Sequence, residues 1–86
     1  MQNNQVKTIE ELITLSSVDG GADFFIHLTG GMRSSKHITY DAEDKTFHIF
    51  NYIDDTEQTL TAAELYNVDK SNIGGAMTVG ALYFNP

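Results

Sequence analysis

Residues 22–53 read ADFFIHLTGGMRSSKHITYDAEDKTFHIFNYI, and this stretch decides the fold. Segments 22–29, 36–41 and 46–53 are rich in aromatic and β-branched residues and contain no proline, which is typical of β-strands. The connections between them are Gly30-Gly31-Met32-Arg33-Ser34 and a short turn around Glu43-Asp44. Because connections this short join antiparallel neighbours, the sequence predicts a three-stranded antiparallel meander.

A helix is predicted on each side of the meander. Thr8 and Glu11 fit the reciprocal capping pattern that starts a helix, and turn residues end this helix near Ser16. Thr61 and Glu64 form a second such pair, which predicts a short helix ending near residue 67.

We therefore expect an α+β domain of two layers with the order α-β-β-β-α. Residues 1–7 are predicted to be a flexible N-terminal tail, and residues 8–86 a single domain. A further helical turn beginning at Ser71 stays open, because Gly74, Gly75 and Gly80 each destabilise a helix by about 1 kcal/mol relative to alanine.

Strand register predicts which side chains share a face. A second hairpin centred on Glu43-Asp44 pairs Tyr40 with Phe47 and Ile38 with Ile49. A first hairpin centred near Met32 pairs Ile26 with Ile38 and Phe24 with Tyr40. The predicted core face consists of Phe24, Ile26, Leu28, Ile38, Tyr40, Phe47, Ile49 and Ile53.

The opposite face carries all three histidines of the chain and several aromatic rings. In this register His27 lies opposite His37, with His48 diagonal to His37. Three imidazoles can bind a metal or sense pH, but no local ligand spacing indicates a metal site, and we expect neither metal nor cofactor. We favour partner binding or self-association through six residues: Phe25, His27, His37, His48, Phe50 and Tyr52.

Two further groups are candidates for binding through charge. Between the first two strands, Arg33, Ser34, Ser35 and Lys36 form an anion-binding loop in one interpretation. In the other, the two basic residues pair locally with neighbouring acids, Asp54, Asp55 and Glu57. A rim of acidic residues is either solvated or faces a cationic protein: Asp41, Glu43, Asp44, Asp54 and Asp55.

Charge and composition exclude several functions. The chain of 86 residues has a formal net charge of −7, which disfavours nucleic acid and anionic membranes as partners. It has no cysteine, hence no disulfide and no thiolate metal site. Without a signal peptide, a membrane-spanning stretch or a recognisable catalytic motif, we expect a cytoplasmic protein that is not an enzyme.

Three segments carry a resemblance to known sequences. GGMRSSKHITYD, FNYIDDTEQTLTAAELYN and SNIGGAMTVGALYF resemble a family of short hypothetical proteins encoded by bacterial genomes and their phages, over about residues 8–84. The resemblance supplies no activity and no functional residue. It implies an inhibitor or adaptor that acts by binding.

These observations favour a small acidic binding module that contacts a protein through its sheet face. The partner is expected to be cationic, or else a second copy of the chain in a homodimer. One alternative is a phage-type inhibitor whose acidic surface occupies the nucleic-acid-binding site of a host protein. The other is a small anion- or nucleotide-binding domain that uses the loop from Arg33 to Lys36.

Overall fold

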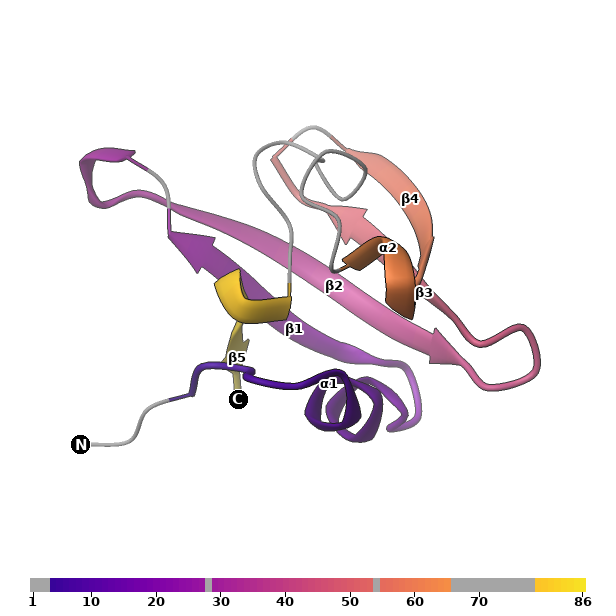
Figure 1. Ribbon diagram of the computed structural model, residues 1–86. Helices are drawn as coiled ribbons and strands as arrows, with labels where there is room; N and C mark the ends of the chain where they lie inside the picture. The colour runs from indigo at the N-terminus through magenta and orange to yellow at the C-terminus, as the bar shows by residue number, and fades with distance from the viewer. Residues whose placement is uncertain (1–3, 28, 54, 66–78) are drawn as a thin grey trace.

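The protein has an α+β fold built on one sheet (Figure 1). The structure, a computed structural model, describes residues 4–27, 29–53, 55–65 and 79–86. In chain order the elements are α1 (Ile9–Ser16), β1 (Ala22–His27), the 3-10 turn η1 (Thr29–Gly31), β2 (Arg33–Asp41), β3 (Thr46–Asn51), β4 (Thr56–Thr61), α2 (Ala62–Leu65), the 3-10 turn η2 (Val79–Ala81) and β5 (Tyr83–Asn85).

Within the described residues the sheet has five antiparallel strands in the order β4-β3-β2-β1-β5. The predicted meander forms its centre as β1, β2 and β3, so the α+β class is confirmed. The prediction of only three strands is wrong, because β4 extends the meander on one side and β5 pairs with β1 on the other. The order of elements is therefore α-β-β-β-β-α-β.

Both predicted helix starts are confirmed by their hydrogen bonds. At α1 the Thr8 hydroxyl oxygen accepts from the Glu11 N–H at 3.2 Å. At α2 the Thr61 N–H donates to the Glu64 carboxylate at 2.9 Å, and the Glu64 N–H donates to the Thr61 hydroxyl oxygen at 3.3 Å. Each pair satisfies N–H groups that the first turn of a helix leaves without partners.

The helices α1 and α2 and the turn η2 lie on the same side of the sheet (Figure 1), which gives the expected two layers. Between the layers the apolar side chains are almost completely buried. This core consists of Val6, Ile9, Leu12, Phe24, Ile26, Ile38, Phe47, Ile49, Leu60, Leu65 and Leu82.

The register of the second hairpin is as predicted, with Tyr40 opposite Phe47 and Ile38 opposite Ile49. The predicted register of the first hairpin is wrong, because Ile26 pairs with Ser34 and Phe24 with Lys36. The chain reverses over Gly30 and Gly31, which have φ values of 83° and 81°, rather than around Met32. The displacement is an even number of residues, so each strand keeps its predicted faces.

Three other predictions about the core need correction or lie outside the described residues. Ile53 is exposed rather than buried, because β3 ends at Asn51 and the chain turns. Leu28 and the helical turn predicted to begin at Ser71 lie outside the described residues, although residues 79–85 form η2 and β5.

The predicted N-terminal tail is partly incorporated into the fold. The Val6 N–H donates to the Leu82 carbonyl at 2.9 Å, and the Phe84 N–H donates to the Asn4 carbonyl at 2.8 Å. Gln5 pairs with Tyr83, and Val6 is only 1% exposed. Residues 4–6 therefore belong to the domain and cover the outer edge of β5.

None of the helices in the described ranges is both long and apolar enough to cross a membrane.

The turn from α1 to β1 contains two glycines with positive φ, and only the second also lacks room for a side chain. Gly20 and Gly21 have φ values of 85° and 79°, a region that residues with a Cβ rarely adopt. A Cβ at Gly21 would lie 2.5 Å from the Thr39 hydroxyl oxygen and 2.6 Å from the Ile38 carbonyl oxygen. A Cβ at Gly20 would meet nothing within 4 Å.

We expect Gly21→Ala to destabilise the protein more than Gly20→Ala, as measured by urea unfolding. Backbone strain lowers the free energy of unfolding of both variants by about 1 kcal/mol. Gly21→Ala loses about a further 1–3 kcal/mol, because the new methyl group presses on β2. Equal losses in the two variants would contradict this close approach.

Candidate functional site

The sheet face opposite the helices, which we call the open face, is covered by no element of the part of the chain that the structure describes (Figure 1). Strand alternation places the side chains of every second residue on it. The open face carries Asp23, Phe25, His27, Arg33, Ser35, His37, Thr39, Asp41, Thr46, His48, Phe50, Glu57, Thr59, Thr61, Tyr83 and Asn85.

A cluster of rings occupies the open face where β1 and β5 pair. The rings of Phe25 and Tyr83 stack with centroids 5.4 Å apart. His27 packs edge-on against both, at 5.4 Å from Phe25 and 4.8 Å from Tyr83. The Arg33 guanidinium carbon lies 4.5 Å from the centre of the Phe25 ring, within the range of a cation–π interaction.

A second pair of rings lies at the end of β3. Phe50 and Tyr52 meet edge to face at 5.1 Å, and the Tyr52 residue is 48% exposed. The Tyr52 N–H donates to the Ser35 carbonyl at 3.2 Å, which continues the β2–β3 register past the end of the strand. Because Ser35 pairs with Phe25 on its other side, the two groups of rings lie on either side of β2. Together we call Phe25, Tyr83, Phe50 and Tyr52 the aromatic band.

His37 is held between two acceptors beside the aromatic band. Its Nδ1 lies 2.8 Å from an Asp23 carboxylate oxygen, and its Nε2 lies 2.6 Å from the Gly20 carbonyl oxygen. The same Asp23 oxygen accepts the Tyr52 hydroxyl at 3.2 Å. Since both neighbours of the ring only accept, both ring nitrogens donate at once when the imidazole is protonated.

These contacts shift two pKa values. The hydrogen bond to Asp23 raises the pKa of His37 above its ordinary value, although partial burial opposes this, and the Gly20 carbonyl and the Asp23 charge add to the rise. Partial removal from water, helped by the Asp23 charge, raises the pKa of the Tyr52 phenol. His37 is therefore stabilised as an imidazolium, and Tyr52 as a neutral phenol.

The three histidines do not form the cluster that we predicted. His27 pairs with Arg33 rather than with His37, because the first hairpin has the shifted register. His37 and His48 are diagonal neighbours as expected, since His37 pairs with Phe50 and Thr39 with His48. In the described ranges no group of three or more possible ligands is arranged to hold a metal ion.

A shallow hollow of about 310 Å³ crosses β2, β3 and β4 on the open face. Its lining includes His37, His48, Phe50, Glu57 and Thr59. The Thr59 hydroxyl lies 3.2 Å from Nδ1 of His48. The hollow thus joins the aromatic band to the outermost strand, β4.

The residues of the predicted anion-binding loop form the first part of β2 instead of a loop. Ser34 and Lys36 point into the core and are completely buried, with the Lys36 ammonium donating to the Ser34 hydroxyl at 3.0 Å. Arg33 lies on the opposite face. Strand alternation therefore separates the two basic groups that would have to converge on an anion.

The alternative prediction paired Arg33 with nearby acids, of which Asp54 lies outside the described residues. The Arg33 guanidinium lies over Phe25, and within the described residues it makes no ion pair with Asp55 or Glu57.

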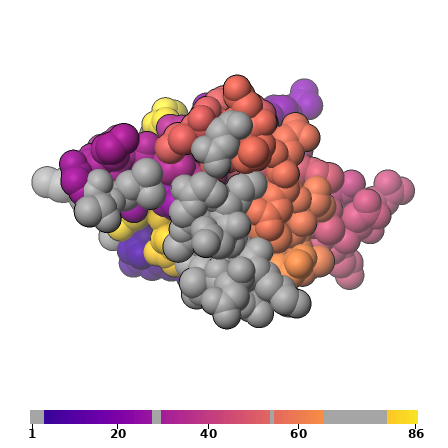
Figure 2. Space-filling view, turned by 90° about the horizontal axis from the view of Figure 1, so that it is seen from above, coloured from indigo at the N-terminus to yellow at the C-terminus, as the bar shows by residue number. Residues whose placement is uncertain are grey.

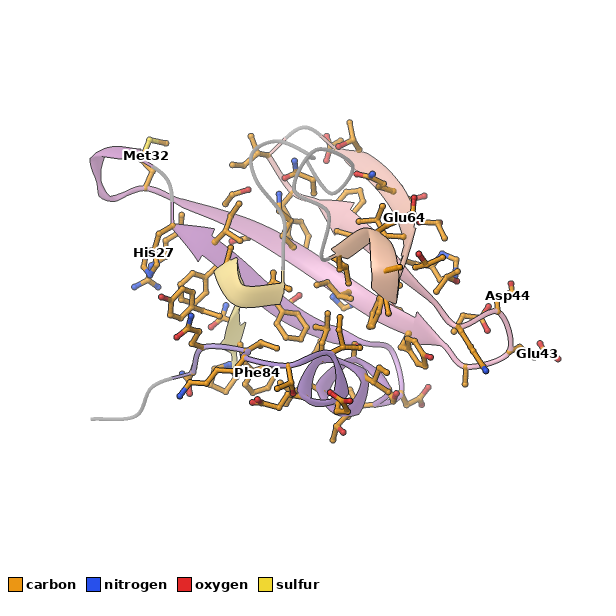
Figure 3. The ribbon with its side chains drawn as sticks, in the orientation of Figure 1. His27, Met32, Glu43, Asp44, Glu64 and Phe84 are labelled. Carbon is orange, nitrogen blue, oxygen red and sulfur yellow. The ribbon has the colours of Figure 1, made fainter. Side chains whose placement is uncertain are left out.

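The acidic residues do not form one continuous rim. Glu43 and Asp44 lie at the exposed tip of the β2–β3 hairpin (Figure 3), where their N–H groups donate to the Asp41 carboxylate at 3.0 and 3.3 Å. Asp55 lies in the turn at the other end of β3, and Asp54 lies outside the described residues. Asp41 thus has a structural role in its turn.

Sequence reasoning missed two residues of this site. Tyr83 was not among the predicted site residues, although the alternating order of Leu82, Tyr83 and Phe84 is compatible with a strand. Asp23 was not among the predicted site residues either, although it pairs with His37 in the sheet. A first hairpin centred on Gly30, instead of Met32, would have predicted that Asp23 pairs with His37.

Comparisons with protein-family models, with curated proteins and with solved structures found no match to this chain.

We expect the His37 contacts to stabilise the fold more at acidic than at alkaline pH. The folded-state pKa of His37 is above its unfolded value of about 6.5. The stabilisation is therefore complete below about pH 6.5 and is lost as the pH rises through the raised pKa. We expect His37→Gln to lower the free energy of unfolding in urea, relative to the unmodified protein, by more at about pH 6 than at about pH 8.5. His48→Gln is the control, and a deficit for His37→Gln that is the same at both pH values would contradict the assignment.

Proposed function

We propose that the protein is a small binding module that holds a partner protein on the open face of its sheet. The observation that carries this proposal is the aromatic band: four large rings lie on a face that no described element covers. Aromatic residues are enriched among the side chains that dominate binding energy at protein interfaces.

The arrangement of the rings suits binding by a preorganised surface. Phe25 and Tyr83 are held by stacking, and Phe50 is held against Tyr52, so these side chains lose little freedom when a partner covers them. The Tyr52 hydroxyl keeps a hydrogen-bonding partner in Asp23. An interface can therefore bury the ring without leaving its hydroxyl unsatisfied.

The polar groups beside the band favour binding over catalysis. An imidazole that acts as a general base needs a free ring nitrogen within reach of the substrate. In His37 one nitrogen faces Asp23 and the other faces the Gly20 carbonyl. This histidine is better suited to fixing the turn before β1 than to transferring protons.

Charge favours a cationic partner. Among the described residues the open face carries three carboxylates, Asp23, Asp41 and Glu57, and Arg33 is its only lysine or arginine. The whole chain carries a net charge of −7. Long-range attraction would speed association with a basic protein surface and slow self-association.

The projecting β2–β3 hairpin supports a second candidate function. Glu43 and Asp44 stand at its tip, away from the helices (Figure 3). An inhibitor that imitates nucleic acid would present such carboxylates to a basic site on a host protein. This candidate predicts binding that depends on the acidic tip rather than on the rings.

We expect Tyr52→Ala to abolish or strongly reduce retention of the native partner in affinity capture from the source organism. Loss of an exposed anchor ring at an interface costs about 2 kcal/mol or more. Met32→Ala is the matched control, because Met32 is 63% exposed at a hairpin tip outside the aromatic band (Figure 3).

Salt dependence separates the two candidates. Capture that survives high salt and fails for Tyr52→Ala supports binding through the aromatic band. The opposite pattern would support nucleic-acid mimicry instead. In that case capture is lost at high salt, survives Tyr52→Ala, and fails when Glu43 and Asp44 are replaced by Gln and Asn.

A further inference from the structure

The Asp23 side chain lies between His37 and the aromatic band. One of its carboxylate oxygens lies 2.8 Å from Nδ1 of His37 and accepts the Tyr52 hydroxyl at 3.2 Å. The Asp23 side chain is 51% exposed all the same, and about half of Tyr52 is exposed as well. A molecule that approaches this part of the open face therefore reaches the carboxylate and the Tyr52 ring together.

A carboxylate beside an exposed aromatic ring suits a cation. The face of such a ring attracts a lysine ammonium or an arginine guanidinium that lies within about 6 Å of its centroid. Asp23 lies at the hydroxyl end of the Tyr52 ring, so a cation held over this ring is also close to a negative charge. The other half of the aromatic band already holds a cation in this way, because the Arg33 guanidinium carbon lies 4.5 Å from the centre of the Phe25 ring.

The charge of His37 decides how strongly Asp23 attracts a cation. The protonated ring donates from Nδ1 to Asp23 and from Nε2 to the Gly20 carbonyl, 2.6 Å away. Its positive charge then offsets the Asp23 carboxylate and repels a second cation. The neutral ring has a single N–H and no charge, so it no longer offsets Asp23.

Other titratable side chains surround His37 at a greater remove. They are Tyr52, which shares the Asp23 oxygen, and His48 and Glu57, which line the hollow beside His37. Both ring nitrogens of His37 face other groups, Asp23 and the Gly20 carbonyl. The hydrogen bond to Asp23 is the main cause that raises the pKa of His37. Asp23 is therefore the carboxylate whose charge the His37 proton offsets directly.

We propose that Asp23 and the exposed Tyr52 ring bind a lysine or arginine side chain of the partner protein, and that the proton on His37 competes with this cation for Asp23. The proposal rests on the proposed binding function and names the partner residue and its regulation. Because the proton and the cation share one carboxylate, each weakens the binding of the other. Partner affinity is therefore lowest below about pH 6.5 and rises as the pH passes the raised pKa of His37, while lysine and arginine stay charged.

The test uses the intact protein at about pH 8.5 as bait for short random peptides displayed on phage. Phage that also bind Tyr52→Ala are removed, which leaves peptides that depend on the Tyr52 ring. We expect these peptides to contain a lysine or arginine. In a synthetic copy, norleucine in place of the lysine, or citrulline in place of the arginine, should weaken binding about three- to fivefold in calorimetry.

Two asparagine variants test the carboxylate. Asp23→Asn should weaken the selected peptide about three- to fivefold at about pH 8.5 and less at about pH 6, where His37 already offsets the charge. Asp44→Asn removes the same charge at the tip of the β2–β3 hairpin and should leave the affinity unchanged. Figure 2 shows this tip, in pink, projecting at one end of the molecule.

Proton linkage tests the competition on the unmodified protein. A selected peptide without histidine should bind about three- to fivefold more weakly at about pH 6 than at about pH 8.5. Calorimetry in buffers of different ionisation enthalpy should show that binding releases protons. In an NMR titration the His37 ring should have a lower pKa in the complex than in the free protein. His37→Gln should remove most of the pH dependence.

Several results would overturn the proposal. These are no peptide that depends on Tyr52, affinity that survives loss of the lysine or arginine, affinity at about pH 6 that equals or exceeds that at about pH 8.5, or equal effects of Asp23→Asn and Asp44→Asn. Failure here is distinguishable from failure of the proposed function. If Tyr52→Ala loses the native partner while these peptide results are negative, the aromatic band binds its partner without a cation at Asp23. If Tyr52→Ala retains the native partner, the proposed function itself fails.

Discussion

The rest of the structure depends on the burial of one face of the central sheet. Phe24, Ile38 and Phe47 from three adjacent strands are completely buried, and the helices and the chain ends supply the apolar side chains that cover them. A chain of 86 residues has only enough apolar side chains for one such core. The open face is therefore not buried by a second core. The positions of its side chains follow from the strand register, which the buried face fixes.

The central part of this arrangement was predictable because its signals are local. Alternation of apolar residues identified the strands, and two capping pairs identified where the helices begin. The first hairpin was predicted around the wrong residue, yet Phe24 and Ile26 still face the core. An even displacement preserves the faces, so the aromatic side chains of β1 and β3 were placed on the open face despite the error.

The remaining features depend on contacts between distant residues. β4 has few apolar residues, and only Leu60 is deeply buried, so its strand pattern is weak. β5 exists because Phe84 packs on Phe24, 60 residues earlier in the chain, with ring centroids 5.7 Å apart. Lys36 was assigned to the end of an anion-binding loop, and its burial beside Ser34 depends on how the helices and chain ends cover the sheet. None of these outcomes has a signal within a short window of sequence.

The contact between residues 4–6 and residues 82–84 has a consequence for how the chain folds. Hairpins such as β2–β3 close over a few residues, whereas this pairing must bring together segments about as far apart as the described chain allows. Long sequence separations delay such contacts, because the intervening loop must be ordered first. Until β5 docks, the outer side of β1 is an unpaired edge. A newly made chain can therefore aggregate through an edge that β5 covers in the folded protein.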